Sequence, residues 1–361
     1  MNDYYDVRLK EYRLAEIVKL ANTNLTNNTN KEISEISAIR VQKEECNSCS
    51  KNKWVFLRGD IADKATIDKL FEEYHPNIVV NLAAQAGVRY SITNPDAYIQ
   101  SNMLGFYNIL EACRHSVKGQ KSKDKGEEPQ TSDLGPQTYR GVEHLVYASS
   151  SSVYGGNKKV PFSTDDRVDN PVSLYAATKK SNELFAHCYS KLYDIPTTGL
   201  RFFTVYGPAG RPDMAYFGFT NKLLKGETIQ IFNYGNCRRD FTYVDDIVEG
   251  IVRVMQGAPE RKTGEDGLPI PPYAVYNIGG GQPENLLDFV QILQEELVRA
   301  GVLLQDYDFE AHKKLVPMQP GDVPVTYADA TALERDYGFT PKITLREGLR
   351  KFSEWYKDYY C

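Results

Sequence analysis

The chain has 361 residues, a mass of 40.9 kDa and a formal net charge of −5 at pH 7. A mildly acidic chain with dispersed basic residues does not attract nucleic acid, so we expect no nucleic-acid partner. No apolar run approaches the length of a membrane span and no signal peptide is visible, so we expect no membrane segment in this chain. This length suits one two-lobed unit or two small domains.

The cysteines indicate a reducing compartment. The chain has six, scattered along its length, which is typical of a cytoplasmic protein. Cys46 and Cys49 have the spacing of half a metal site. No second pair accompanies them, so we predict no metal site.

Two polar stretches interrupt the pattern of the chain. Residues 22–53 are rich in Asn, Thr, Ser and Glu, and residues 117–140 in Lys, Glu, Gln, Gly and Pro. Segments of this kind carry too little apolar surface to form a core, so we predict solvated insertions. A partner-binding role is the alternative.

Short apolar runs alternate with helical patterns along the rest of the chain. Strands are expected at 77–83, 145–148, 198–203 and 273–278, and two of the helices at 181–193 and 286–299. Strands that alternate with helices predict an α/β fold with a doubly wound parallel sheet.

The sequence Ser173-Leu-Tyr-Ala-Ala-Thr-Lys179 carries the strongest chemical signal, and it follows a serine run that ends a predicted strand. Residues four apart on a helix share one face, so the Lys179 ammonium would lie beside the Tyr175 phenol. A neighbouring cation lowers the pKa of a phenol, which lets it take a proton from a hydroxyl near pH 7. Ser150 would hold that hydroxyl, and a nicotinamide cofactor, NAD, would accept the hydride.

These motifs, with several others in the same order, resemble an extended short-chain dehydrogenase/reductase. Within that group the chain is most similar to the UDP-glucuronate 4-epimerases, from Asn2 to about Tyr356. The matching segments are Asn81-Leu-Ala-Ala-Gln-Ala-Gly-Val-Arg-Tyr-Ser91, Tyr147-Ala-Ser-Ser-Ser-Ser-Val-Tyr-Gly155, Leu200-Arg-Phe-Phe-Thr-Val-Tyr-Gly-Pro208, Gly210-Arg-Pro-Asp-Met214, Arg238-Arg-Asp-Phe-Thr-Tyr-Val-Asp-Asp246 and Met318-Gln-Pro-Gly-Asp-Val323.

The resemblance implies a Rossmann-type NAD-binding domain over 1–202, to which 242–278 returns. A smaller C-terminal α/β lobe over 203–241 and 279–361 would bind the UDP-sugar. It also implies a homodimer, formed through a helix bundle that includes the Tyr175 helix.

Members of this family open with a strand, a Gly-x-x-Gly-x-x-Gly turn and a helix that hold the cofactor pyrophosphate. The chain has no such turn. We therefore expect the first strand–helix unit to be missing, either because the first segment was lost or as a natural variant. The expected consequences are weak NAD affinity and impaired folding, because a buried strand would lose its neighbour. A Golgi-membrane location is the alternative if a missing N-terminus carried an anchor.

The cofactor residues implied by the resemblance lie along the predicted sheet edge. They are Asp60, Ile61, Ala83, Ala84, Asn102, Tyr175 and Lys179. For Asp60 a simple helix cap is the alternative role, and for the two alanines it is tight packing.

The residues after the catalytic serine distinguish related families. Dehydratases place Asp-Glu there and decarboxylases a Glu in the second place, whereas this chain has Ser151 and Ser152. Neither hydroxyl is an efficient acid or base near pH 7, which favours simple oxidation and reduction at C4.

A uronic acid adds a carboxylate that is lost as CO₂ from a 4-keto sugar unless it is held. Arg211 is the first candidate to hold it, helped by Thr178 and Ser151, and Arg89 is the second; for both arginines a structural ion pair is the alternative. The resemblance adds further substrate residues: Ser152, Thr204, Lys222, Arg239 and Asp322.

The predicted activity is C4 epimerisation of UDP-glucuronate to UDP-galacturonate. A UDP-glucose/galactose-type 4-epimerase is the enzymatic alternative. The place three residues before Asp322, which is usually an arginine in UDP-galactose 4-epimerases, is Gln319 here and disfavours it. A catalytically impaired UDP-sugar-binding relative is the other alternative, because the phosphate loop is absent from the sequence.

Overall fold

The computed structural model describes residues 6–23, 55–116, 141–318 and 324–361. They belong to two compact units, one of 1–59 with 211–213 and one of 60–210 with 214–361. The predicted insertions lie outside the described residues, except that Asn22 and Thr23 end a helix, α1 (Val7–Thr23), in the smaller unit. Cys46 and Cys49 also lie outside them.

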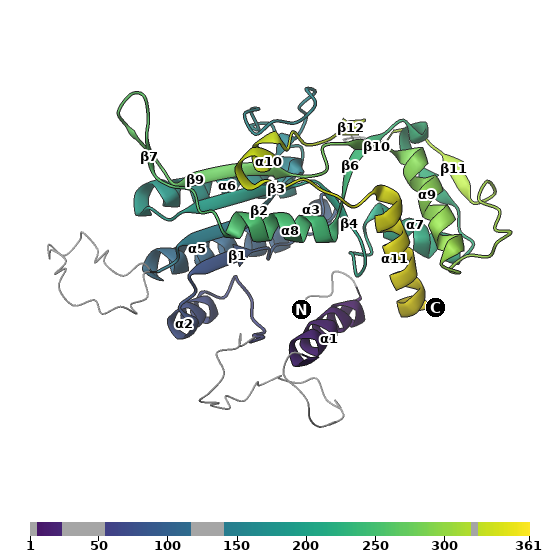
Figure 1. Cartoon of the computed structure of the whole chain (residues 1–361), viewed down its shortest axis with the longest axis horizontal. Helices are drawn as coiled ribbons and strands as arrows, with labels where there is room; N and C mark the ends of the chain where they lie inside the picture. Colours follow the sequence, from purple (N-terminus) through teal and green to yellow (C-terminus); the bar gives the residue numbers. More distant parts are fainter. Residues whose placement is uncertain (1–5, 24–54, 117–140, 319–323) are drawn as a thin grey trace. The chain divides into compact units, whose positions relative to one another are not determined.

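The larger unit is built around a four-stranded parallel sheet (Figure 1). Its strands, in sheet order, are β1 (Ile78–Asn81), β2 (His144–Ser150), β3 (Thr197–Phe202) and β9 (Tyr273–Ile278). Each falls on one of the four segments predicted as strands, so the predicted α/β class with a parallel sheet is confirmed.

The other elements of the larger unit are helices and short strands. The helical segments are α2 (Lys64–Tyr74), α3 (Tyr90–Thr93), α4 (Pro95–Tyr98), the π-helix η1 (Ile99–Leu104), α5 (Gly105–Ser116), the 3₁₀ turn η3 (Ser151–Tyr154), α6 (Leu174–Tyr193), α7 (Ala215–Leu224), the turn η4 (Phe232–Gly235), α8 (Val244–Met255), α9 (Leu286–Arg299), α10 (Thr331–Tyr337) and α11 (Leu345–Tyr360). The remaining strands are β4 (Thr204–Tyr206), β5 (Ile229–Ile231), β6 (Arg238–Tyr243), β7 (Lys262–Thr263), β8 (Pro269–Ile270), β10 (Pro283–Asn285), β11 (Lys313–Leu315) and β12 (Val325–Thr326).

Helices cover both faces of the main sheet. Neighbouring side chains of a strand point to opposite faces, so one strand contacts helices on both sides. On β2, Leu145 and Tyr147 pack in a buried cluster with α2, α5 and α6. Val146, between them, packs in a second buried cluster with α8 and α10. A strand buried on both faces needs a continuous apolar run, which is the pattern the sequence shows here.

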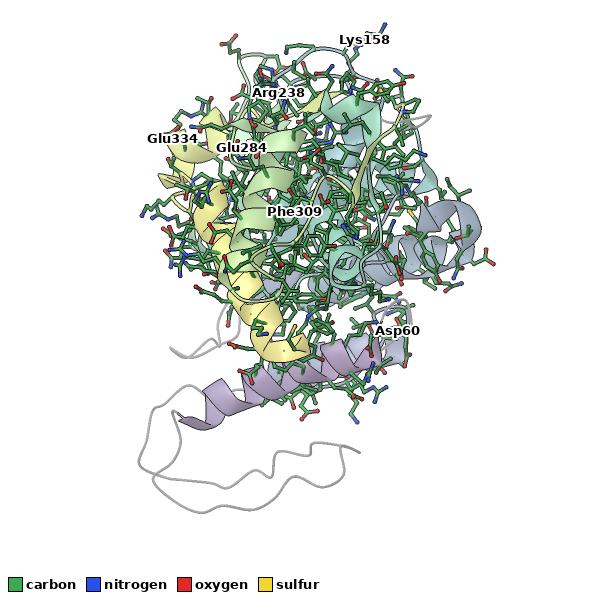
Figure 2. All side chains as sticks on the ribbon, turned by 90° about the vertical axis from the view of Figure 1, so that its right-hand side faces the viewer. Asp60, Lys158, Arg238, Glu284, Phe309 and Glu334 are labelled. Atoms are coloured by element: carbon green, nitrogen blue, oxygen red, sulfur yellow. The ribbon has the colours of Figure 1, made fainter. Side chains whose placement is uncertain are left out.

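A second sheet lies in the C-terminal part of the larger unit. Its central strand β6 pairs with β10 and β12, and β4 pairs with β6 as well. Arg238 on β6 and Glu284 on β10 are labelled in Figure 2. The predicted domain boundaries stay a prediction.

In the described part of the chain, no helix has both the length and the apolar character needed to cross a membrane.

Candidate active site

Ser150 is the last residue of β2 and is buried. Its extended backbone leads straight into η3, and its Oγ accepts a hydrogen bond from the Ser152 backbone N–H at 3.2 Å. Among the described residues that is its one side-chain hydrogen bond, so the Ser150 O–H remains available to a ligand. The carboxyl edge of a parallel sheet is where α/β folds bind ligands.

Tyr175 and Lys179 lie one turn apart near the start of α6. The helix begins at Leu174 because the Oγ of Ser173 accepts a hydrogen bond from the Ala176 backbone N–H at 3.1 Å. Tyr175 is half-buried, and the buried Lys179 donates from Nζ to the Ala148 carbonyl at 2.8 Å. The lysine is therefore attached to the strand that ends at Ser150.

The electrostatics of Lys179 suit a ligand with hydroxyl groups. Burial lowers the pKa of its ammonium from 10.5 to about 8. An ammonium has three N–H donors, and among the described residues one of them is used, by the Ala148 carbonyl. The predicted role of the remaining donors, to bind the nicotinamide ribose, stays a prediction.

The side chain of Asn102, which was predicted to contact the cofactor, makes three hydrogen bonds within the protein. Its Oδ1 accepts from the Gln85 N–H at 2.8 Å, and its Nδ2 donates to the Gln85 carbonyl and to Thr178 Oγ1, both at 3.0 Å. It lies in the π-helix η1, a helix type that is frequent at functional sites. Asn102 therefore holds in place the loop that carries Ala83 and Ala84.

Thr178, predicted to help hold the substrate, is also engaged within the fold. Its hydroxyl donates to the Tyr175 carbonyl at 2.8 Å and accepts from Asn102, and the residue is 2% exposed.

The two alanines, by contrast, leave the end of β1 open. Ala83 is exposed and Ala84 half-buried. Small side chains at that position permit the close approach of a ligand.

The alternative role considered for Asp60 is wrong, because Asp63 caps the following helix. Asp63 accepts from the backbone N–H groups of Ala65 and Thr66 at the start of α2. The exposed Asp60, labelled in Figure 2, accepts from the Ala62 N–H at 2.9 Å. Ile61 is half-buried in the cluster beneath the sheet.

The predicted substrate residues are spread over several elements. Ser151 and Ser152 are half-buried in η3, and Thr204 is half-buried at the start of β4. Arg239 on β6 donates to the Arg238 and Pro324 carbonyls, each at 3.0 Å. Lys222, on α7, is exposed.

For the other three predicted substrate residues, Arg89, Arg211 and Asp322, the substrate role stays a prediction. Arg89 is exposed just before α3. Arg211 belongs to the smaller unit, where its Nε and Nη2 bind the two carboxylate oxygens of Asp213 at 3.1 and 3.0 Å. Asp322 lies outside the described residues.

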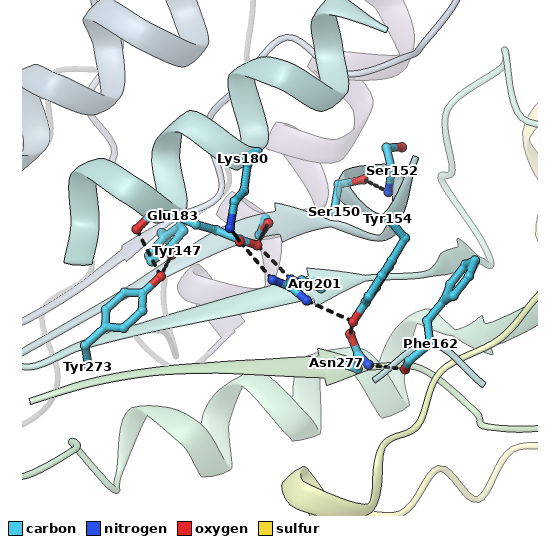
Figure 3. Close-up of polar contacts among 11 residues, drawn as sticks. Tyr147, Ser150, Ser152, Tyr154, Phe162, Lys180, Glu183, Arg201, Tyr273 and Asn277 are labelled. Atoms are coloured by element: carbon cyan, nitrogen blue, oxygen red, sulfur yellow. Dashed lines mark hydrogen bonds and ion pairs between the residues drawn. The ribbon is translucent and has the colours of Figure 1, made fainter. Parts of the chain in front are cut away.

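A buried polar network centred on Glu183 and Arg201, which was not predicted from the sequence, includes Ser149, the residue before Ser150 (Figure 3). The sequence does indicate the position of Glu183: it follows Lys179 by four residues, so the two share one helix face. Arg201 is a lone charge inside the apolar strand β3, and such a charge is buried only when it is paired. Neither signal identifies the partner.

The chain is similar to known proteins over most of its length. Residues 20–279 match the model of the NAD dependent epimerase/dehydratase family. The chain is 45% identical to Protein CapI of Staphylococcus aureus, over 100% of this chain and 90% of that protein. It is 38% identical to the probable UDP-glucuronate 4-epimerase of Rhizobium meliloti (strain 1021), over 100% of this chain and 89% of that protein.

A solved structure extends the likeness to the fold. A UDP-glucuronic acid 4-epimerase from Bacillus cereus, in complex with UDP-glucuronic acid and NAD, is 29% identical. It superimposes with a TM-score of 0.65, over 84% of this chain and 82% of that one. The chain is therefore an enzyme of the NAD-dependent epimerase/dehydratase family, with the Rossmann-type α/β fold of that family.

Proposed function

We propose that the chain catalyses the C4 epimerisation of UDP-glucuronate to UDP-galacturonate. The observation that carries the proposal is the attachment of the buried Lys179, one turn from Tyr175, to the strand that ends in Ser150. The relatives named above support the choice of a UDP-sugar and of a uronate.

In the proposed reaction, the chain's own residues move one proton. The Tyr175 phenolate removes the proton of the C4 hydroxyl, while the Ser150 hydroxyl donates to the C4 oxygen. The Lys179 ammonium favours the phenolate by its charge and orients the nicotinamide ribose. When bound, NAD supplies a reversible hydride acceptor. After the 4-keto sugar has turned, Tyr175 returns the proton to the C4 oxygen of the other epimer.

The residues next to Ser150 support epimerisation over elimination. Loss of water from a sugar needs an acid and a base, whereas Ser151 and Ser152 offer hydroxyls. The C6 carboxylate must be held against loss as CO₂. We assign this role to Arg211 on the family resemblance, because a guanidinium binds a carboxylate through two parallel hydrogen bonds. Arg89 is the alternative.

The test is product analysis by NMR after incubation of UDP-glucuronate with the chain and excess NAD⁺. We expect UDP-galacturonate. In Arg211→Ala we expect a UDP-pentose by-product or a loss of uronate turnover of about 100-fold, and in the matched Arg89→Ala the wild-type product. Turnover of UDP-glucose but not of the uronate would favour the hexose epimerase. Absence of any turnover would favour the impaired UDP-sugar-binding relative.

A further inference from the structure

We infer that the buried Glu183–Arg201 ion pair is a positioning element that fixes Ser150 for proton transfer. The inference rests on the proposed function for what Ser150 does, but not for how it is held. The pair is drawn with Ser150 in Figure 3 and takes no part in the proposed chemistry.

The two charged groups form a complete bidentate contact inside the fold. Arg201 Nε donates to Glu183 Oε1 at 2.8 Å and Nη2 donates to Oε2 at 2.9 Å. Both residues are 3% exposed. Two buried charges held in this way have one preferred geometry, so the α6 and β3 segments that carry them cannot shift independently.

Both flanks of Ser150 are attached to this pair. On one side, the hydroxyl of Ser149 donates to Glu183 Oε1 at 2.7 Å. On the other side, Tyr154 ends the turn η3, and its hydroxyl accepts from Arg201 Nη1 at 3.0 Å. The Arg201 guanidinium also lies over the Tyr154 ring, 4.9 Å from its centroid. Ser150 is therefore bracketed by two residues that a single ion pair holds.

A fourth segment completes the bracket. The Tyr154 hydroxyl donates to Asn277 Oδ1 at 2.7 Å, and Asn277 Nδ2 donates to the Phe162 carbonyl at 2.7 Å. Asn277 belongs to β9. Because the aromatic ring is fixed at both its face and its hydroxyl, η3 has a defined end, and the direction in which the chain leaves Ser150 is set.

One face of α6 links this network to the predicted proton-transfer residues. Lys179 binds the Ala148 carbonyl and Glu183, one turn later, binds the Ser149 hydroxyl. These two hydrogen bonds hold Ala148 and Ser149, the residues immediately before Ser150, against α6. Displacement of that strand end by a fraction of an ångström would alter the distance from Ser150 to Tyr175, and rates depend steeply on such distances.

The pair also keeps the local charge defined. Burial by itself would raise the pKa of the Glu183 carboxyl, but the hydrogen bonds and charge of Arg201 hold it below its ordinary value. The positive charge of the Arg201 guanidinium therefore balances the negative charge of the Glu183 carboxylate. Removal of Arg201 would leave the buried carboxylate one turn from Lys179 with Lys180 as its cation, at 3.4 Å from Glu183 Oε2. The ion pair itself is therefore unsuitable for a mild test.

The test uses Ser149→Ala and Tyr154→Phe, which detach one flank each and keep both charges. Tyr337→Phe is the matched control, because the Tyr337 hydroxyl donates at 2.7 Å to the carbonyl of Gly257, two residues after α8. We expect kcat to fall by about tenfold in each flank variant with KM unchanged, and by less than the product of the two in the double variant. Tyr337→Phe should keep the wild-type kcat.

A second readout does not depend on turnover. Amide hydrogen exchange of the segment 148–155, measured on the ligand-free chain, should be faster in both flank variants and unchanged in the control. Unchanged exchange there would overturn the inference in any case. In a chain that turns over UDP-sugar, an unchanged kcat, or losses confined to KM, would overturn it as well. If the wild-type chain shows no turnover but the exchange changes as expected, the proposed function fails and the positioning role of the pair stands.

Discussion

At the scale of single residues, Lys179 is a charge that the fold accommodates at a cost. Burial lowers the pKa of its ammonium from 10.5 to about 8. The shift corresponds to about 3 kcal/mol of lost stability at pH 7, where the folded protein must keep the ammonium charged. Between pH 8 and 10.5 the folded state binds fewer protons at Lys179 than the unfolded chain does, so the contribution of this residue to stability rises with pH across that window.

Lys179→Met is therefore expected to separate stability from activity. The free energy of unfolding should rise by about 1–3 kcal/mol at pH 7, because the lost hydrogen bond to Ala148 offsets part of the gain. The rise in stability from pH 8 to 10.5 should disappear with the ammonium. Turnover should fall by about 100-fold or more. Urea unfolding at pH 7 and 10 checks the first two effects, and a variant less stable than the wild type at pH 7 would contradict them.

Residue types were predicted better than residue contacts. The pairing of Tyr175 with Lys179 follows from helical spacing alone, and α6 confirms that both share one helix. The role of Asp60 did not follow, because two aspartates three residues apart can both precede a helix. Only the backbone geometry shows that Asp63 is the cap.

At the scale of elements, the strand β2 carries Ser150 at its end and His144 at its start. Like Lys179, His144 is a buried titratable residue. His144 Nε2 lies 2.9 Å from Thr198 Oγ1 on β3, and Nδ1 lies 3.3 Å from the Met255 carbonyl at the end of α8. Burial lowers the pKa of this imidazole below 6.5, so the folded state favours the neutral ring. Its contribution to stability is complete above pH 6.5 and is lost as the pH falls and the unfolded chain takes up a proton.

We therefore expect protonation of His144 at acid pH to destabilise the folded state. The free energy of unfolding of the wild type should fall by up to about 1.4 kcal/mol per pH unit below pH 6.5 because of this residue. His144→Gln should have a flatter profile between pH 7.5 and 5.5 in urea unfolding. Equal slopes in the two proteins would show that His144 does not contribute.

The elements themselves were largely predictable. All four strands of the main sheet and both helices named from the sequence are present, because strands buried on both faces leave a continuous apolar signature. The Glu183–Arg201 pair joins residues on different elements, and Asn102 reaches across 17 and 76 residues to Gln85 and Thr178. Contacts of this range depend on how elements pack, which no local pattern encodes.

At the scale of the whole molecule, three of the motifs shared with the family include the carboxyl ends of strands of the main sheet: 81–91 at β1, 147–155 at β2 and 200–208 at β3. This agrees with the family match over residues 20–279 and with the solved structure of the Bacillus cereus enzyme. Homodimerisation stays a prediction. The exposed Leu184 and Leu192, 58% and 63% accessible on the helix that carries Tyr175, are compatible with it.

The central claim is that the C4 hydrogen leaves and returns as hydride within one site. UDP-glucuronate deuterated at C4, incubated in ordinary water with the chain and excess NAD⁺, tests this most directly. NMR and mass spectrometry of the product are expected to show UDP-galacturonate that retains its deuterium at C4. Product in which the label has been replaced by solvent hydrogen would contradict the account, because the C4 hydrogen would then have left as a proton.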